Sequence, residues 1–154
     1  MGIKIIATNK KAYHDFFIDE VVEAGIVLTG TEVKSLRQAK VNLKEAFCRI
    51  KDGEVYVNNM HISPYEHGGR ENPEDPTRMR KLLLHKDEIA KLTRKVEEKG
   101  LSLVPTRIYF KASRAKLEIG VARGKKLHDK RETIKQKEAD REMAKVVKSR
   151  GRGD

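Results

Sequence analysis

Residues 46–57, AFCRIKDGEVYV, alternate apolar and polar side chains on both sides of Asp52-Gly53. An alternation with a period of two predicts a strand with one buried face, here the face that carries Ala46, Cys48 and Ile50. Asp-Gly between two such runs favours a two-residue turn, because both central positions of that turn need a positive φ. The stretch therefore predicts an antiparallel β-hairpin, with Cys48 as a small buried hydrophobic residue.

The residues upstream of this hairpin predict an interrupted strand followed by a short helix. Residues 15–28 are rich in Phe, Ile and Val, and Gly25 predicts a break or bulge before a second short extended piece. Thr29 and Glu32 match the capping-box pattern, which starts a helix. We expect this helix to run from about residue 30 to residue 39.

The predicted short helix carries a row of basic residues. Val33 and Leu36 are expected to face inward, whereas Lys34, Arg37 and Lys40 follow one another at steps of three residues. Residues three apart lie on the same side of a helix. The helix is therefore expected to present a basic stripe to solvent.

Downstream of the hairpin, residues 63–77 contain three prolines and two adjacent glycines, which predict a long, mobile loop. A strand, a helix and two further strands are expected after it: Met79–His85, Lys86–Lys99, Leu101–Phe110 and Leu117–Val121. Gly100 gives the helix a C-terminal stop. The last two strands form a hairpin around residues 111–114.

Several short antiparallel strands with one or two helices favour a mainly β fold with short helices. We expect an OB-like closed antiparallel β-barrel, the small barrel used for oligonucleotide binding, in residues 1–123. Residues 124–154 form a basic C-terminal tail in this interpretation. The sequence therefore predicts one domain and one appendage.

The tail differs in composition from the barrel. Residues 125–154 contain 11 basic and 6 acidic residues and no aromatic residue. Such a segment cannot bury enough apolar surface to fold alone, so we expect it to be disordered until it binds. Four apolar residues recur at helical spacing: Ala139, Met143, Val146 and Val147. A bound tail is therefore expected to form a basic helix.

The charge of the chain indicates a polyanionic partner. Its 154 residues include 34 Lys and Arg against 23 Asp and Glu, a formal net charge of +11. Charged residues make up 37% of the chain, where about 25% is usual. A balance this basic attracts nucleic acid. No apolar run of about 18 residues and no signal-peptide pattern is present, so we expect a cytoplasmic monomer that does not bind membranes.

The sequence offers little for catalysis or for metal binding. None of the five histidines has metal-ligand spacing, and Cys48 is the only cysteine. His85 and Asp87 lie close together, but they bracket a predicted helix start, where capping is the ordinary role. We expect no metal, no cofactor and no catalytic residue.

Basic residues gather in three clusters that favour phosphate binding. The first is Asn9-Lys10-Lys11, which is expected to precede the first strand, and the second is the row on the short helix. The third surrounds His128 with Lys125-Lys126 and Lys130-Arg131. Three clusters in a chain of net charge +11 favour phosphate binding over ordinary solvated surface charge.

Three motifs resemble those of the small protein B (SmpB) family: AGIVLTGTEVKSLR at 24–37, RKLLL at 80–84 and GVARGKKLHDKR at 120–131. The similarity runs from Thr8 to the end of the tail. It implies an oligonucleotide-binding-type barrel that grips the tRNA-like domain of transfer-messenger RNA, also called SsrA. It also implies that the tail enters the vacant messenger channel of the small ribosomal subunit and reports an empty A site to the decoding centre. The chain would then be an adaptor for trans-translation, the rescue of stalled ribosomes.

The resemblance assigns roles to single residues. RNA binding would fall to Asn9, Lys10, Lys11, Glu32, Lys34, Ser35, Arg37, Lys81, Lys125 and Lys126. The decoding centre and messenger channel would be contacted by His128, Asp129, Lys130, Arg131, Lys135 and Lys137. The imidazole of His128 would stack on an unpaired base. Glu32 repels phosphate, so it is the capping partner of Thr29, a hydrogen-bond acceptor for a base or ribose, or both.

Two other functions fit parts of the sequence. A structural protein of the ribosome would also carry a basic tail, threaded through ribosomal RNA, and would co-purify with every small subunit. An enzyme that modifies or cleaves RNA would use His85 or His128, and its turnover would disappear in His→Ala variants. The motifs favour the adaptor over both.

Overall fold

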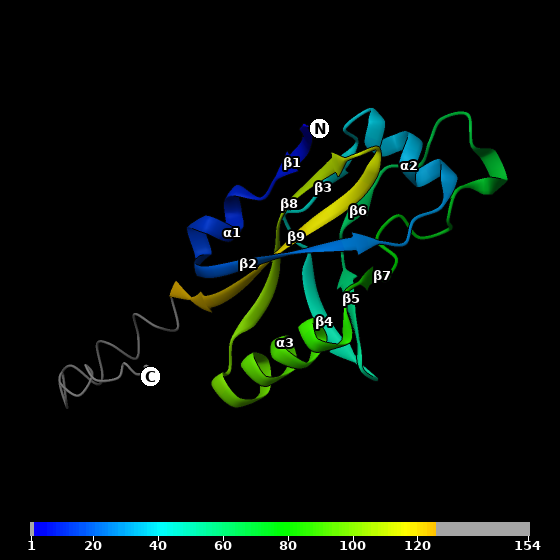
Figure 1. Ribbon diagram of the computed structural model, residues 1–154. Helices are drawn as coiled ribbons and strands as arrows, with labels where there is room; N and C mark the ends of the chain where they lie inside the picture. Colours follow the sequence, from blue (N-terminus) through cyan, green and yellow to red (C-terminus); the bar gives the residue numbers. More distant parts are fainter. Residues whose placement is uncertain (1, 126–154) are drawn as a thin grey trace.

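The computed structural model describes residues 2–125, and within them the chain forms a mainly β domain with short helices (Figure 1). The strands are β1 Ile3–Thr8, β2 Phe16–Ile26, β3 Val41–Asn42, β4 Phe47–Lys51, β5 Glu54–Asn58, β6 His61–Ile62, β7 Arg80–Leu83, β8 Ser102–Lys111 and β9 Arg114–Gly124. The helices are α1 Lys10–Asp15, α2 Gly30–Arg37 and α3 Lys86–Lys99, with a 3-10 turn, η1, at Gly69–Glu71. The predicted fold class is confirmed. The predicted tail helix lies outside the described residues.

The strand pairings close on themselves. The large sheet has the order β1-β8-β4-β5-β7-β2-β9, and β9 pairs in addition with β8. Six antiparallel strands, from β8 round to β9, therefore form a ring, and β1 adds to the outside of β8. Strands β3 and β6 form a separate two-stranded ribbon beside this ring.

The ring is closed unevenly. Strands β2 and β9 pair over most of their length, as do β8 and β9. By contrast, β4 and β8 are joined through one residue pair, Cys48 with Leu103. Next to this seam lies a pocket of about 410 Å³, lined largely by apolar side chains of β4, β8 and the end of α3. Of the strand pairings in the ring, this seam has the fewest paired residues.

Two hairpins depend on residues with positive φ. In the β4–β5 turn, Asp52 and Gly53 have φ values of 52° and 76°, and this hairpin matches the prediction. In the β8–β9 turn, Ala112 and Ser113 have φ values of 51° and 65°. This second turn therefore holds two ordinary residues in a conformation that favours Asn-Gly.

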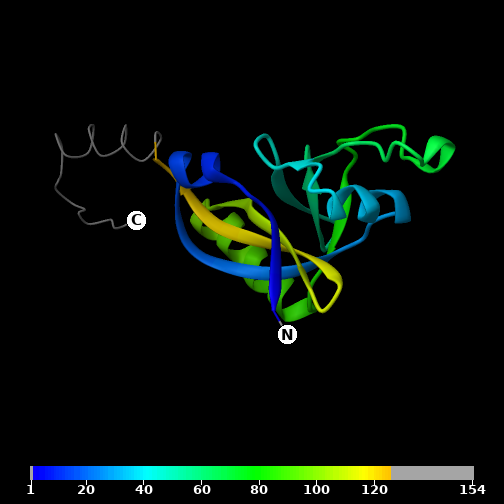
Figure 2. The same cartoon turned by 90° about the horizontal axis from the view of Figure 1, so that it is seen from above.

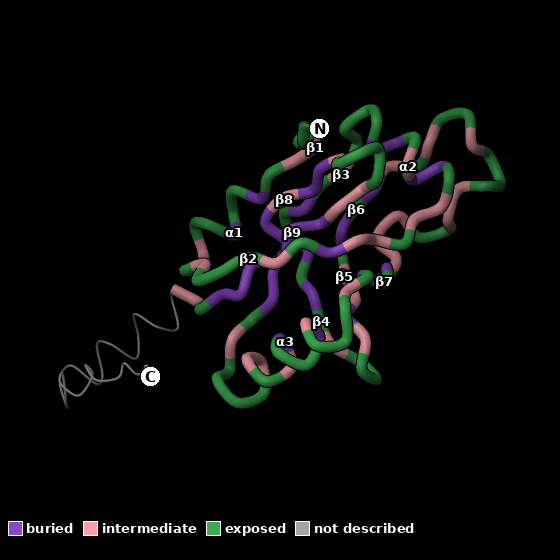
Figure 3. The backbone as a smooth tube through the Cα atoms, viewed as in Figure 1, coloured by how far each residue is buried: buried purple, intermediate pink, exposed green. Residues whose placement is uncertain are grey.

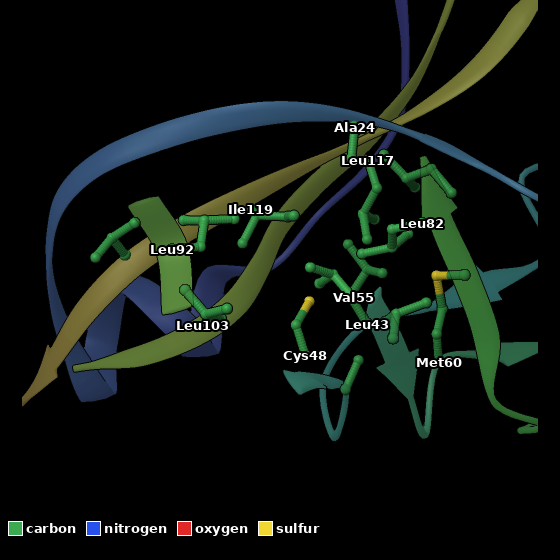
Figure 4. Close-up of a cluster of buried hydrophobic side chains, with 14 of the residues drawn as sticks. Ala24, Leu43, Cys48, Val55, Met60, Leu82, Leu92, Leu103, Leu117 and Ile119 are labelled. Carbon is green, nitrogen blue, oxygen red and sulfur yellow. The ribbon is translucent and has the colours of Figure 1, made fainter. Parts of the chain in front are cut away.

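The core is one contiguous apolar cluster inside the ring, to which α3 contributes (Figure 4). Val55, Leu82, Leu117 and Ile119 are fully buried. Cys48 belongs to this cluster, and burial raises the pKa of its thiol, so it has the predicted role of a small buried hydrophobic residue. A second cluster seals the end of the domain near α1, whereas the hairpin tips are exposed and the loop before β7 is partly exposed and partly half-buried (Figure 3).

The N-terminal prediction was wrong in two respects. Residues 9–11 do not precede the first strand, because β1 comes before them and they cap and begin α1. Strand β2 is continuous through Gly25, and its irregularity falls between Ile18 and Glu20. A Cβ on Gly25 would lie 3.3 Å from the Cβ of Leu83, so this glycine allows close approach of two strands.

The other predicted elements are confirmed with small changes. Helix α3 has the expected bounds, and Gly100 ends it with a φ of 66°. Helix α2 ends two residues earlier than expected, and β7 is shorter than the predicted strand. The long loop is present and contains η1. Within the described part of the chain, no helix has the length and apolar character needed to span a membrane.

Candidate nucleic-acid interface

Helix α2 presents the predicted basic stripe. The hydroxyl of Thr29 accepts from the backbone N–H of Glu32, and the Glu32 carboxylate accepts from the backbone N–H of Thr29, which completes the capping box. Lys34 and Arg37 are exposed, and Lys40 is exposed just beyond the helix. The stripe is therefore available to phosphates.

The buried side of α2 carries charge instead of a plain apolar face. Glu32 is 3% exposed and Arg80 is 1% exposed, and their ion pair measures 2.7 Å. Arg78 forms a second ion pair with Glu32, also at 2.7 Å. Burial by itself raises the pKa of Glu32, but hydrogen bonds from Arg78, Arg80 and the Thr29 backbone outweigh it and keep that pKa below its usual value. The predicted capping role of Glu32 is confirmed, and both of its carboxylate oxygens are engaged inside the protein.

The same cluster holds the loop before β7. The guanidinium of Arg80 donates to the carbonyl oxygens of Met60 and Pro76 at 2.6 and 2.9 Å. Ser35, fully buried, donates its hydroxyl to the carbonyl of Ser63 at 2.7 Å. Two of the predicted site residues, Glu32 and Ser35, therefore fix the loop against α2, while Lys34 and Arg37 face solvent.

The N-terminal site residues lie at α1. The side chain of Asn9 is buried, accepts from the N–H of Ala12 and donates to the carbonyls of Leu43 and Pro105. Lys10 and Lys11 are exposed on the helix that Asn9 caps. Asn9 therefore positions the two lysines, much as Glu32 and Ser35 position the α2 stripe.

Lys125 lies close to α1. Its ammonium donates to the carbonyl of Tyr13 at 3.1 Å and lies 5.1 Å from the ring centroid of Phe17. Arg123 lies over the same ring at 5.0 Å and pairs with Asp19. Lys126 and the predicted decoding-centre residues, His128 onward, lie outside the described residues.

Sequence reasoning missed the aromatic part of this surface. Tyr13 and Phe17 are 46% and 37% exposed. Phe17 pairs with Arg123 across the β2–β9 ladder, which only the strand register reveals. The alternation of this strand was the available signal, because it predicts that one of two neighbouring side chains faces solvent. Residues 16 and 17 are both phenylalanine, so the sequence did not show that Phe17 is the exposed one.

Lys81 lies on a third face of the barrel, formed by β7 and β2. It is exposed and pairs with Glu54 at 3.7 Å. Beside it, Leu83 is 54% exposed and packs over Gly25. On β2, Glu23 accepts a hydrogen bond from the Tyr109 hydroxyl at 2.6 Å, which lowers the pKa of that carboxyl. The face combines apolar and polar groups, and sequence reasoning found only its lysine.

The predicted RNA-binding residues therefore do not form one cluster. Helix α2 and the loop with η1 lie at one end of the domain, and α1 with the end of β9 lies at the other (Figures 1 and 2). Lys81 belongs to the barrel between them. The arrangement suits an extended ligand that carries many phosphates.

No group of three or more His, Cys, Asp or Glu side chains within residues 2–125 is placed to hold a metal ion. His85 occupies the N-cap position of α3, as predicted, with its backbone N–H donating to Glu88 at 2.9 Å. Its position is explained by the helix start.

Known proteins resemble this chain along nearly its whole length. The model of the SmpB protein family matches residues 6–149. An SsrA-binding protein of Syntrophotalea carbinolica is 73% identical over 97% of this chain and 99% of its own length. One of Geobacter sulfurreducens is 57% identical over 99% of both chains.

A solved structure is also similar. It is described as "tmRNA-SmpB: a journey to the center of the bacterial ribosome", and the two chains share 54% identity with a TM-score of 0.65. The similarity covers 77% of this chain and 83% of the solved one. Fold, motifs and relatives agree, and the chain belongs to the SmpB protein family.

Proposed function

We propose that this protein is an RNA-binding adaptor for trans-translation. It binds the tRNA-like domain of transfer-messenger RNA and delivers that RNA to stalled ribosomes, without catalysis of its own. The observation that carries the proposal is identity of 73% over nearly the full length to a protein named for SsrA binding. A net charge of +11 and exposed lysines and arginines on a rigid domain supply the physical basis.

In this proposal, the barrel and the tail have different roles. Residues 1–123 are the RNA-binding barrel. Residues 124–154 are the tail, which becomes helical on the ribosome in the messenger channel and near the decoding centre. The protein acts in the cytoplasm as a monomer. Strand β9 ends at Gly124, and this supports a boundary near that residue.

Within the barrel, the predicted site residues divide into two kinds. Lys10, Lys11, Lys34, Arg37 and Lys81 are exposed and contact RNA phosphates in this proposal. The buried polar residues Asn9, Glu32 and Ser35 act through the elements that they hold in place. Lys125 and Lys126 continue the contact at the start of the tail, and His128 to Lys137 act on the ribosome.

Deletion of the residues after Leu127 tests the division between barrel and tail. We expect the truncated protein to bind the tRNA-like domain within about threefold of wild type, because each barrel contact contributes separately. Tagging of nascent chains on stalled ribosomes should be lost. Loss of RNA affinity in the truncated protein would show that barrel and tail are wrongly assigned. If the full-length protein instead co-purified with every small ribosomal subunit in equal amount, it would be a structural protein of the ribosome.

A further inference from the structure

Tyr65 and His67 form an aromatic pair on the loop that faces α2. Their ring centroids are 5.6 Å apart with an interplanar angle of 78°. The ammonium of Lys34 lies 5.4 Å from the centroid of Tyr65. Neither aromatic residue belongs to the apolar clusters identified within residues 2–125. Core packing therefore does not explain why aromatic rings stand at these positions.

The backbone around Tyr65 is held in place. The side chain of Asn72 accepts from the N–H of Tyr65 at 2.8 Å and donates to its carbonyl at 2.9 Å. The hydroxyl of Thr31, on α2, donates to the carbonyl of Glu71. A Cβ on Gly68 would lie 2.9 Å from the Thr31 methyl group, so the loop packs directly on the start of the helix. The loop is therefore held against α2 and forms one surface with it.

The groups on this surface match those that contact unpaired nucleotides. RNA-binding sites for single-stranded segments stack bases on aromatic side chains and place Lys or Arg against the neighbouring phosphates. Here Tyr65 is half-buried and His67 is exposed, with the exposed Lys34 beside Tyr65 and the exposed Arg37 three residues further along α2. A loop of this length in a small domain is also commonly functional.

We propose that Tyr65 and His67, together with Lys34 and Arg37, bind an unpaired nucleotide of the tRNA-like domain. The inference rests on the proposed function, since it places a new contact for the same RNA beside α2. The base stacks on the aromatic pair, and the flanking phosphates meet the two cations. Glu32 and Arg80 are positioning residues for this site, because they hold the loop against the helix.

Substitution of Tyr65 tests the contact. Tyr65→Leu keeps apolar bulk but removes the ring, and we expect affinity for the isolated tRNA-like domain to fall about fivefold or more. Tyr65→Phe keeps the ring and should bind within about twofold of wild type. Phe47→Leu is the matched control, since Phe47 is 40% exposed on β4, away from the predicted site residues. It should leave the affinity unchanged.

Fluorescence gives an independent readout, because the chain contains no tryptophan. In Tyr65→Trp, a base stacked on the indole should quench its emission when the RNA is added, and Phe47→Trp should show no comparable quenching. The proposal would be overturned if Tyr65→Leu bound the tRNA-like domain with wild-type affinity. It would also be overturned if this variant lost affinity only for small ribosomal subunits and not for the tRNA-like domain. Failure of the wild-type protein to bind the tRNA-like domain would instead refute the proposed function.

Discussion

Glu32 shows how a residue in an RNA-binding motif acts through the structure of the protein. Its carboxylate caps α2 and neutralises two arginines from the other side of the loop. The acidic side chain is thereby engaged inside the protein and does not face the phosphates in the proposed RNA interface. The basic stripe of α2 keeps its charge, and the loop gains a fixed position.

Removal of the Glu32 charge should destabilise the domain. Glu32→Gln leaves Arg80 buried without its anionic partner, and we expect the free energy of unfolding at pH 7 to fall by about 3 kcal/mol. Glu54→Gln is the control, since the Glu54 ion pair with Lys81 is largely exposed, and it should cost less than about 1 kcal/mol. Urea denaturation measures both. Equal effects would contradict the special role of the buried pair.

The same carboxylate predicts a dependence of stability on pH. The pKa of Glu32 is lower in the folded protein than its ordinary value of 4.5. Its contribution is therefore fully present above the unfolded pKa and is lost as the pH falls through the folded pKa. We expect the stability difference between wild type and Glu32→Gln to be constant from pH 7 to about pH 5 and to shrink below about pH 4. A difference that stays constant down to about pH 3 would exclude this linkage.

For single residues, the sequence predicted only contacts between residues that are close together in the chain. The Thr29–Glu32 box spans three residues and was predicted from them alone. The arginine partners of Glu32 are 46 and 48 residues away, beyond any periodic signal. The family resemblance assigned Asn9 and Ser35 to RNA binding, and their distant backbone partners and their burial became visible only in the fold.

Among the elements, those with a strong internal pattern were predicted well. Helix α3 has three apolar residues on one face and a glycine stop, and its bounds were predicted to the residue. Strand β1 was missed because it lies at the edge of the sheet. Ile3 and Ile5 are 46% and 50% exposed, so the apolar residues at the start of this strand do not mark a buried face. Helix α1 has six residues, too few for a periodic pattern.

The β8–β9 turn carries a correctable strain. Ala112 and Ser113 both have positive φ, a conformation that costs an ordinary residue about 1 kcal/mol or more. Ala112→Asn combined with Ser113→Gly supplies the preferred turn residues, so we expect the free energy of unfolding to rise by about 1 kcal/mol. Thermal denaturation should show a midpoint a few degrees higher.

A reciprocal change in the other hairpin provides the control for this turn. Gly53 has a φ of 76° in the β4–β5 turn, so Gly53→Ala should lower the free energy of unfolding by about 1 kcal/mol. The two changes act on turns of the same length in one domain. A β8–β9 turn variant no more stable than wild type would mean that the positive φ values there carry little strain.

For the whole molecule, the arrangement of charge was the least predictable property. The basic clusters were identified from the sequence, but their separation to the two ends of the barrel depends on strand order and register. The pairing of Phe17 with Arg123, over more than one hundred residues of chain, illustrates this. Composition predicts that a polyanion binds, and only the fold shows how widely the exposed basic residues are spread.

Salt dependence tests whether one RNA contacts both ends of the domain. Each phosphate contact adds about 0.7 to 0.9 to the slope of log affinity against log salt concentration. Lys34→Ala with Arg37→Ala should therefore lower the slope for the tRNA-like domain by about 1.4 to 1.8, and so should Lys10→Ala with Lys11→Ala. The control of equal charge is Lys51→Ala with Lys91→Ala, which removes two exposed lysines from other parts of the surface. Because the two ends are far apart, the combined variant should show the sum of both changes. An unchanged slope for either pair would remove that end of the barrel from the interface.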